Sequence, residues 1–277
     1  MISALAGAVD LLCCPRCGTG FAMIDGTLRC SQRHSFDIAK QGYANLTGAP
    51  QPAHADSSAM VAARADLLAS GRYAAVVDAL VAALPIEVGT LLDVGTGTGH
   101  YAAAALDGRP GARALGLDVS VAACRRAARV HPRLAVVTAD AWAGLPVVDT
   151  CVDVVLSVFS PRNAEEFARV LRPDGSVISV TPDPDHLAEL RSAFGLLGVE
   201  DGKESRLAEA FGRAGLIAAE QRTIRRREPW TADDAVRSIM MGPNAFHSRA
   251  EVVRAEAARL TWPRPVTTSC VITRWAR

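Results

Sequence analysis

The feature that most constrains this chain is a turn with three alternating glycines that directly follows a short apolar segment. Residues 90–94 are apolar enough to predict a short buried strand, and Gly95, Gly97 and Gly99 come next. Glycine has no Cβ atom, so such a turn can bend tightly and let its backbone pass close to a ligand. The alanine-rich residues 100–106 then predict a helix. A strand, a glycine turn and a helix in this order predict a ligand-binding corner in an α/β protein.

The spacing of the glycines indicates which ligand this corner binds. A dinucleotide fingerprint reads G-x-G-x-x-G, whereas here the glycines run G-x-G-x-G and Asp93 precedes them by two positions. This pattern resembles motif I of the class I S-adenosylmethionine (AdoMet) methyltransferases. AdoMet has no pyrophosphate, but its sulfonium, amino-acid tail and ribose suit a close backbone and a carboxylate. The motif therefore suggests AdoMet contacts at Asp93, Gly95, Gly97, Thr98 and Gly99; the alternative is a glycine-rich turn in another α/β protein.

Length and composition exclude several broad classes. With 277 residues the chain can form one large domain and a small one, and its net charge of +1 does not by itself indicate a nucleic-acid partner. No apolar run reaches the roughly 20 residues that cross a bilayer, and the N-terminus lacks the basic region of a signal peptide. The seven cysteines are odd in number, and Cys13, Cys14, Cys17 and Cys30 cluster near the start of the chain. This usage predicts a reduced, cytoplasmic protein with a metal site and no membrane partner.

Residues 1–46 predict a separate small module that a metal holds together. A C-x-x-C pair is followed by a Cys and a His four positions apart, and the gap carries the hairpin signal Asp25 and Gly26. Two such ligand pairs match a tetrahedral structural zinc site. The predicted ligands are Cys14, Cys17, Cys30 and His34. Cys13 is an alternative to Cys14, and a thioredoxin-type motif is disfavoured because no strand precedes the pair and two more ligands follow.

Residues 47–85 connect this module to the large domain. Residues 47–56 predict a linker; Asp56 or Ser57 then caps a helix that ends at Gly71, and a second helix covers residues 73–84. Both helices either pack on the large domain or cover the AdoMet pocket, in which case Tyr73 is an aromatic contact.

Residues 86–277 alternate strands and helices, which predicts a doubly wound parallel sheet. The strand at 112–118 ends in Asp118, about twenty residues after the glycines, where a carboxylate suits ribose hydroxyls. Alternatively, Asp118 caps the helix that begins near Ser120. The strand at 134–138 ends near Asp140, a candidate for the adenine end. Later strands are expected at 151–158 and 177–181, with a turn at 171–175 between them.

The tail is less regular. Helices are expected at 187–197, 203–214, 231–241 and 249–260, and strands at 216–227 and 266–276. The strand at 216–227 enters a run of arginines at positions 222, 225, 226 and 227. Such a run is typical of a solvated edge strand; contact with phosphates is the alternative.

Several segments resemble one family, the 23S ribosomal RNA guanine-N1 methyltransferases with an N-terminal zinc finger, which includes the tylosin-resistance methylase. Besides the zinc ligands and the glycine corner, the matching segments are residues 34–46 (H-S-F-D-I-A-K-Q-G-Y-A-N-L), 56–73, 159–161 (F-S-P), 181–190 and 241–243 (M-G-P). They follow the family's order over nearly the whole chain. Ser160 replaces the family's usual alanine, a change at the expected target pocket.

The resemblance implies a class I AdoMet methyltransferase fold, a Rossmann-like doubly wound sheet, with a small zinc-binding domain. It implies methylation of guanine N1 in a 23S rRNA hairpin loop, either as macrolide resistance or as a housekeeping modification. It carries over AdoMet contacts at Tyr73, Gly97, Thr98 and His186, and it suggests a homodimer. The sequence shows no convincing general base for the guanine N1 proton. Asp153, Asp183 and Asp185 are candidates, but none is favoured over bulk water as the proton acceptor.

Two rival functions stay open. The first is methylation of a small molecule by the same fold, which the near-neutral charge favours. The second is zinc-dependent RNA binding without catalysis, which the intact glycine corner disfavours.

Overall fold

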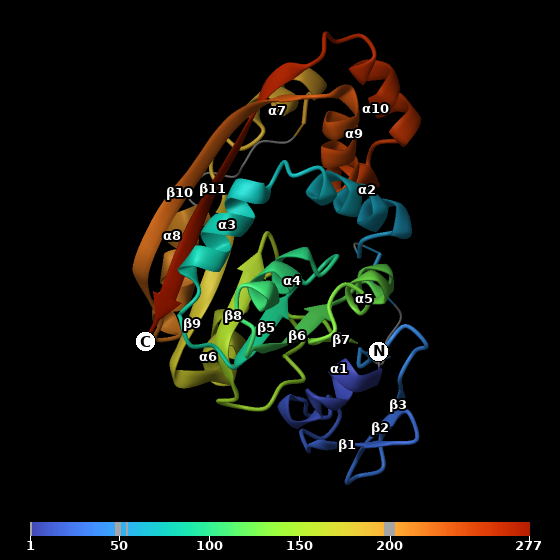
Figure 1. The fold of residues 1–277 in the computed structure, drawn as a ribbon, viewed down its shortest axis with the longest axis vertical. Coiled ribbons are helices and arrows are strands. Elements are labelled where there is room, and N and C mark those ends of the chain that lie inside the picture. Colours follow the sequence, from blue (N-terminus) through green and yellow to red (C-terminus); the bar gives the residue numbers. More distant parts are fainter. Residues whose placement is uncertain (1, 48–50, 54, 197–202) are drawn as a thin grey trace.

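The computed structural model describes residues 2–47, 51–53, 55–196 and 203–277 and contains one large sheet and one small one. The large sheet has the order β10-β11-β9-β8-β5-β6-β7-β4 (Figure 1). Its strands are β4 (Tyr43–Asn45), β5 (Thr90–Val94), β6 (Arg113–Asp118), β7 (Leu134–Thr138), β8 (Val152–Val158), β9 (Leu171–Pro182), β10 (Ile217–Trp230) and β11 (Arg264–Ala276). The pairs from β9 to β4 are parallel, whereas β10 and β11 add two antiparallel strands at the β9 edge. The predicted class, a doubly wound α/β fold, is confirmed.

Helices cover both faces of this sheet. They are α1 (Ile2–Ala6), α2 (Ser58–Ala69), α3 (Ala74–Ala83), α4 (His100–Asp107), α5 (Val121–Ala127), α6 (Ala164–Val170), α7 (Ala188–Phe194), α8 (Lys203–Arg213), α9 (Ala232–Met240) and α10 (Ala250–Ala257). Because strand side chains alternate between faces, Leu91 belongs to the core beneath α3, α4 and α5, while Leu92 belongs to the core beneath α1, α6 and α8. Within the described residues, no helix is long and apolar enough to cross a membrane.

The parallel order places the ligand-binding edge at β5. This strand lies between β6 and β8. The chain continues from β5 to β6 and β7 on one side and then crosses to β8 on the other side. Ligands of open α/β sheets bind at such a switch point, beyond the carboxyl ends of the strands. The glycine turn follows β5 at this point.

The N-terminal module has little core of its own. Its antiparallel strands β1 (Phe21–Ile24), β2 (Thr27–Cys30) and β3 (Ser35–Asp37) form the small sheet. Asp25 and Gly26, both with positive φ, form the predicted hairpin turn. Leu28 and Phe36 share one apolar cluster with Leu92 of β5. The chain then leaves the module through β4, which adds a parallel strand beside β7.

Most predicted element boundaries agree with the structure, and the cap residues explain why. Ser57 accepts a hydrogen bond from the Met60 N–H, so α2 begins where predicted; Asn163 caps α6 in the same way. The helix predicted at 187–197 ends at Phe194 before Gly195, which has a φ of +60°; part of this range and of the predicted linker lies outside the described residues.

The turn predicted at 171–175 is wrong. This segment is the first part of β9, because Leu171 pairs with Val152 and the register then shifts to Ser176 beside Val154. The residues that the sequence predicts as a turn therefore form an irregularity within β9, where its register with β8 shifts.

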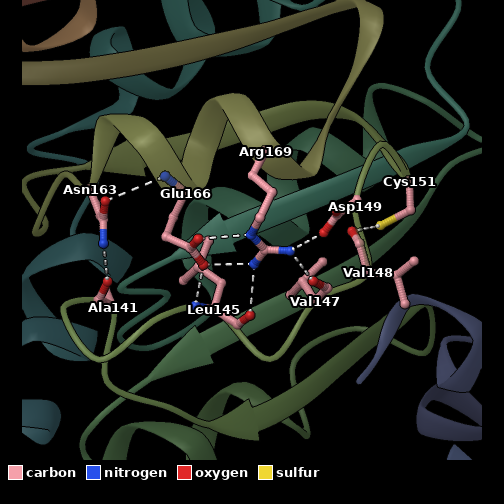
Figure 2. Close-up of polar contacts among 9 residues, drawn as sticks. All are labelled: Ala141, Leu145, Val147, Val148, Asp149, Cys151, Asn163, Glu166 and Arg169. Atoms are coloured by element: carbon pink, nitrogen blue, oxygen red, sulfur yellow. Dashed lines mark hydrogen bonds and ion pairs between the residues drawn. The ribbon is translucent and has the colours of Figure 1, made fainter. Parts of the chain in front are cut away.

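The loop between β7 and β8 is fixed by Arg169 of α6 (Figure 2). The Arg169 guanidinium donates to both carboxylate oxygens of Glu166, at 2.7 and 2.6 Å, and to Asp149 at 2.6 Å. It also donates to the carbonyls of Leu145 and Val147, at 2.9 and 2.7 Å. All five guanidinium contacts are made with this loop or with Glu166 of α6, so Arg169 holds the loop in place beside α6.

A second contact fixes the start of the same loop. The Asn163 side-chain amide donates to the Ala141 carbonyl at 3.1 Å, while its oxygen caps α6 (Figure 2). Residues 139–142 line a cavity described below, so α6 holds one wall of that cavity in place.

We predict that Arg169→Ala lowers the free energy of unfolding by about 2 kcal/mol, since it removes the five guanidinium hydrogen bonds and leaves the Asp149 carboxylate without its ion-pair partner. For a chain of this size, the midpoint of thermal unfolding should fall by about 4–8 °C. The matched control is Arg225→Ala, because the Arg225–Asp185 ion pair is more than half exposed and should contribute about 0.5 kcal/mol or less. Equal melting shifts for the two variants would contradict the argument.

Candidate active site and metal centre

Two adjoining cavities lie beyond the carboxyl ends of the parallel strands. The first, which we call the tyrosine cavity, has a volume of about 300 Å³, and Tyr73, Thr98 and His186 line it. The second, the aspartate cavity, has about 260 Å³ and is lined by Asp118 and Asp140. Arg64, Gly95 and Phe159 line both. Two cavities joined at one glycine suit an elongated ligand bent around that glycine.

The glycine corner depends on the absence of side chains. Gly95 has a φ of +74°, and a Cβ atom there would lie 2.4 Å from the Cβ of Ser160. Gly97 has a φ of +55° and also lines the tyrosine cavity. Gly99 has another role: a Cβ there would lie 2.7 Å from Val130, so it allows α4 to pack closely rather than lining either cavity. The corner therefore requires glycine for two different contacts.

Asp93 supports the corner from behind. Its carboxylate is 2 % exposed, accepts a hydrogen bond from the Thr96 hydroxyl at 2.7 Å and lies outside both cavity linings. Burial raises the pKa of Asp93 to about 7, because a charge at this depth is poorly solvated. The acidic residue of the motif thus holds the turn in shape.

Asp118 joins the corner to the next strand. One of its oxygens accepts from the Gly97 N–H and the other from the Ser120 N–H, both at 2.8 Å. The N-cap of α5 is Ser120, which accepts from the Ala123 N–H. Asp118 itself lines the aspartate cavity, and burial raises its pKa. Asp140 lines the same cavity and accepts from the Trp142 N–H at 2.9 Å.

Tyr73 and His186 form a hydrogen-bonded pair in the tyrosine cavity. The Nδ1 atom of His186 faces the Ser269 N–H at 3.3 Å, so it accepts; in a neutral ring the proton is then on Nε2. Burial lowers the pKa of His186 to about 4, which keeps the ring neutral near pH 7. Nε2 lies 3.3 Å from the Tyr73 hydroxyl, which therefore accepts. Among the described residues, the Tyr73 proton has no other acceptor, so it is free for a ligand.

Phe159 stands where the two cavities meet. It follows β8, its φ is +52°, and 39 % of the side chain is exposed. Its ring lies edge-to-face with Tyr73, at 6.1 Å between centroids. A positive φ in a bulky residue is costly and commonly marks a functional position. The sequence indicates this residue only through the F-S-P segment.

Sequence reasoning missed Arg64, although it lines both cavities. Its guanidinium forms an ion pair with Asp56 and donates to the Met241 carbonyl at 2.8 Å. It therefore ties the start of α2 to the segment after α9. Residues 56–73 and 241–243 both contribute to the resemblance, but the sequence does not show that these two segments are in contact in the fold.

The N-terminal module brings its four predicted metal ligands together. The ligand atoms of Cys14, Cys17, Cys30 and His34 all lie within 4.8 Å of one another. The Cys17 and Cys30 sulfurs are 3.6 Å apart, and the His34 Nδ1 is 3.4 Å from the Cys30 sulfur. A zinc tetrahedron with Zn–S bonds of about 2.3 Å has S–S edges of about 3.7 Å, so the spacing fits.

Cys13 is not part of this set. Its N–H donates to the Pro146 carbonyl, and it pairs with Gly20 as a bridge. The Gly18 and Cys17 N–H groups instead donate to the Cys14 carbonyl, which forms the knuckle around Cys14. Backbone geometry therefore selects Cys14 as the ligand.

Fold, glycine corner and ligand cluster together define a class I AdoMet-dependent methyltransferase that carries a structural zinc ribbon. Two family models agree with this class: one described as "RlmA, N-terminal" matches residues 12–51, and one described as "Methyltransferase domain" matches residues 91–175.

Relatives identify the family. The 23S rRNA (guanine(748)-N(1))-methyltransferase of Streptomyces fradiae is 42 % identical over 96 % of each chain. A protein of Micromonospora griseorubida that is assigned as a 23S rRNA (guanine-N1)-methyltransferase is 40 % identical, and the match covers 95 % of this chain and 96 % of that protein. The chain belongs to this family of 23S rRNA (guanine-N1)-methyltransferases.

A solved structure shows the fold alone. A chain from the complex between the Haloferax volcanii Trm112 methyltransferase activator and a methyltransferase has a TM-score of 0.54 and 23 % identity. The match covers 81 % of this chain and 99 % of that one.

We predict that Cys17→Ser lowers the bound zinc, about one ion per chain in the unchanged protein, and exposes the module to proteolysis, since the metal replaces a core. The matched control is Cys13→Ser, which removes a neighbouring thiol outside the cluster and should keep its zinc. Metal content is measured by mass spectrometry after dialysis. Equal zinc loss in both variants would show that the ligand set is wrong.

We also predict a pH-dependent effect of Asp93→Asn on stability. Because the folded pKa of about 7 lies above the ordinary value of 3.8, the native protein binds more protons, and its stability falls as pH rises through this window. The asparagine side chain does not titrate, so the variant does not lose stability in this way. Its free energy of unfolding, relative to that of the unchanged protein, should therefore rise by about 2 kcal/mol between pH 5 and pH 7. Denaturant unfolding without AdoMet measures the difference; a difference that stays constant with pH would contradict the burial argument.

Proposed function

We propose that this protein transfers the methyl group of AdoMet to N1 of a guanine in a hairpin loop of 23S rRNA. The observation that carries the proposal is that one chain holds both the AdoMet cavities and the zinc module, in the same order as a full-length relative at 42 % identity. That relative is named for guanine 748, and we take the equivalent nucleotide as the target. Methylation there as macrolide resistance is part of the proposal.

The two cavities divide the cofactor between them. Asp118 and Asp140 line the cavity assigned to the adenosine, and Asp118 is held by two backbone donors with its carboxylate near the ribose site. Tyr73, His186 and the backbone at Gly97 and Thr98 line the cavity assigned to the amino-acid tail. The free Tyr73 proton suits the tail carboxylate, and Gly95 lies where the two halves meet. Asp93 and Gly99 act indirectly, by shaping the turn.

Positioning of the target base explains most of the expected rate. Bound AdoMet supplies an electrophilic methyl group, and the base must leave its stack to reach it. The exposed Phe159 ring at the end of β8 provides a surface on which the extruded guanine lies. Ser160 and Pro161 extend this surface beside the glycine corner. Such placement of nucleophile, methyl and sulfur in line converts a bimolecular reaction into an oriented one.

His186 does not accept the N1 proton in this proposal. Its Nε2 already carries a proton, and its Nδ1 faces the Ser269 N–H. The proton therefore leaves to water after or during transfer. The three aspartates weighed from the sequence as bases, Asp153, Asp183 and Asp185, line neither cavity.

The zinc module contributes to RNA binding rather than to chemistry. Four ligands fill the tetrahedron and leave no open position for a substrate. Arg16, Arg29, Arg33 and Lys40 lie exposed on the module and supply charges for phosphates. A homodimer in the cytoplasm, with two modules facing one RNA, completes the proposal.

We predict that the protein transfers radiolabel from AdoMet to unmodified 23S rRNA and creates a reverse-transcription stop at one guanine, since a methyl on N1 blocks pairing. Tyr73→Phe keeps the ring and removes the donor, so it should raise the KM for AdoMet by about tenfold or more. Arg225→Ala serves as the control. Label that enters small molecules of a cell extract but never RNA would support the rival small-molecule function.

A further inference from the structure

A groove with three arginines lies beside the cofactor cavities. It runs between the first turns of α2 and the outer face of α5 and has a volume of about 470 Å³. Ser58, Val61 and Ala62 of α2 form one wall. Arg125, Arg126 and Arg129 form the other, and all three are exposed. Among the described residues, no acidic side chain lines the groove.

These arginines have no counter-charge in the part of the chain that the structure describes. Within the described residues, none of the three has a hydrogen bond or an ion pair through its guanidinium. Nearby arginines do have them: Arg64 pairs with Asp56, and Arg133 donates to four carbonyls. Arg125 and Arg126 lie on α5 and Arg129 in the turn that follows it, and like charges this close repel one another. An anionic partner would relieve this repulsion.

The groove also lies in a suitable place. Ser120, the N-cap of α5, donates to the Asp56 carbonyl next to α2, and Asp118 just before it lines the aspartate cavity. A helix of seven residues is about 10 Å long, so the arginines are one short helix away from the cofactor. α2 and α5 are on the same side of the molecule as the zinc module (Figure 1). The groove is therefore close to the active site, and the helices that form it are on the same side of the molecule as the module.

We propose that this groove binds phosphodiesters of the rRNA stem that carries the target loop. The partner is chosen by its chemistry: arginine forks bind phosphate oxygens in pairs, and a row of three suits successive phosphates of one strand. Val130, which is 41 % exposed at the end of the groove, supplies an apolar contact for a sugar. This inference rests on the proposed rRNA substrate and adds a surface that holds it.

The test compares two triple variants that remove equal charge. The first is Arg125→Gln/Arg126→Gln/Arg129→Gln. The control is Arg213→Gln/Arg222→Gln/Arg226→Gln, on α8 and the edge strand β10, at the opposite side of the molecule (Figure 1). A third variant, Arg125→Lys/Arg126→Lys/Arg129→Lys, keeps the charge. Circular dichroism checks that each is folded.

The first measurement is equilibrium binding of a 23S rRNA hairpin fragment over a range of salt concentrations. Each phosphate contact contributes about 0.7–0.9 to the slope of log K against log salt, so the groove variant should lose about 2–3 in slope. Its affinity should fall at least about tenfold near physiological salt, while the lysine protein keeps most of the slope. AdoMet affinity by calorimetry should stay unchanged in all three.

Three outcomes overturn the inference. The groove variant binds RNA like the unchanged protein; or the control variant loses the slope instead, which places the RNA along β10; or both lose it equally, which indicates a general charge effect. Failure of the proposed function is separate, because the unchanged protein would then leave rRNA unmethylated whatever the groove does.

Discussion

The close approach of the backbone at Gly95 to Ser160 is the contact on which the active site depends. A Cβ atom at Gly95 would lie 2.4 Å from the Ser160 Cβ, so the carboxyl ends of β5 and β8 can approach only with glycine there. This approach places Phe159 beside the glycine corner and joins the two cavities. Asp93, through Thr96, and Asp118, through the Gly97 N–H, hold the corner from two sides. The carboxylates therefore stabilise a shape that the glycines make possible.

The zinc module is joined to this site through the sheet. Leu28 and Phe36 pack in the same cluster as Leu92 of β5, and β4 forms main-chain hydrogen bonds with β7. A three-stranded sheet of this size buries too little apolar surface to be stable alone, so metal ligation and the large domain share the task. The orientation of the module relative to the cavities is consequently fixed by a strand pair, and a bound RNA would meet both surfaces together.

The parts of the site that sequence could predict are those in which neighbours in the chain carry the chemistry. The C-x-x-C knuckle, the hairpin at Asp25 and Gly26 and the Ser57 cap are local, and each agrees with the structure. Contacts between distant segments were not predictable. Arg64 bonds the Met241 carbonyl 177 residues away, and Tyr73 meets His186 across 113 residues. Only the resemblance singled out His186, and it did so without showing the tautomer.

Roles were harder to predict than positions, because burial decides them. Asp93 matches the acidic position of the motif, yet it is 2 % exposed and bonds Thr96, so its carboxylate serves the turn. Gly99 matches a motif glycine, yet it relieves a contact with Val130. The segment 171–175 has turn residues, yet a register shift makes it part of β9. In each case the local pattern does not show which neighbour in the folded chain decides the role of the residue.

The fixed proton of His186 limits how this site can work. A ring whose Nδ1 faces a backbone N–H and whose Nε2 donates to Tyr73 has no lone pair for a substrate proton. Protonation would cost the Ser269 contact, and burial already holds the pKa of His186 near 4. The histidine therefore orients the Tyr73 hydroxyl toward a ligand acceptor, as a positioning residue. In the proposed reaction, placement of the base would depend on Phe159 and the glycine corner, and the N1 proton would pass to water rather than to His186.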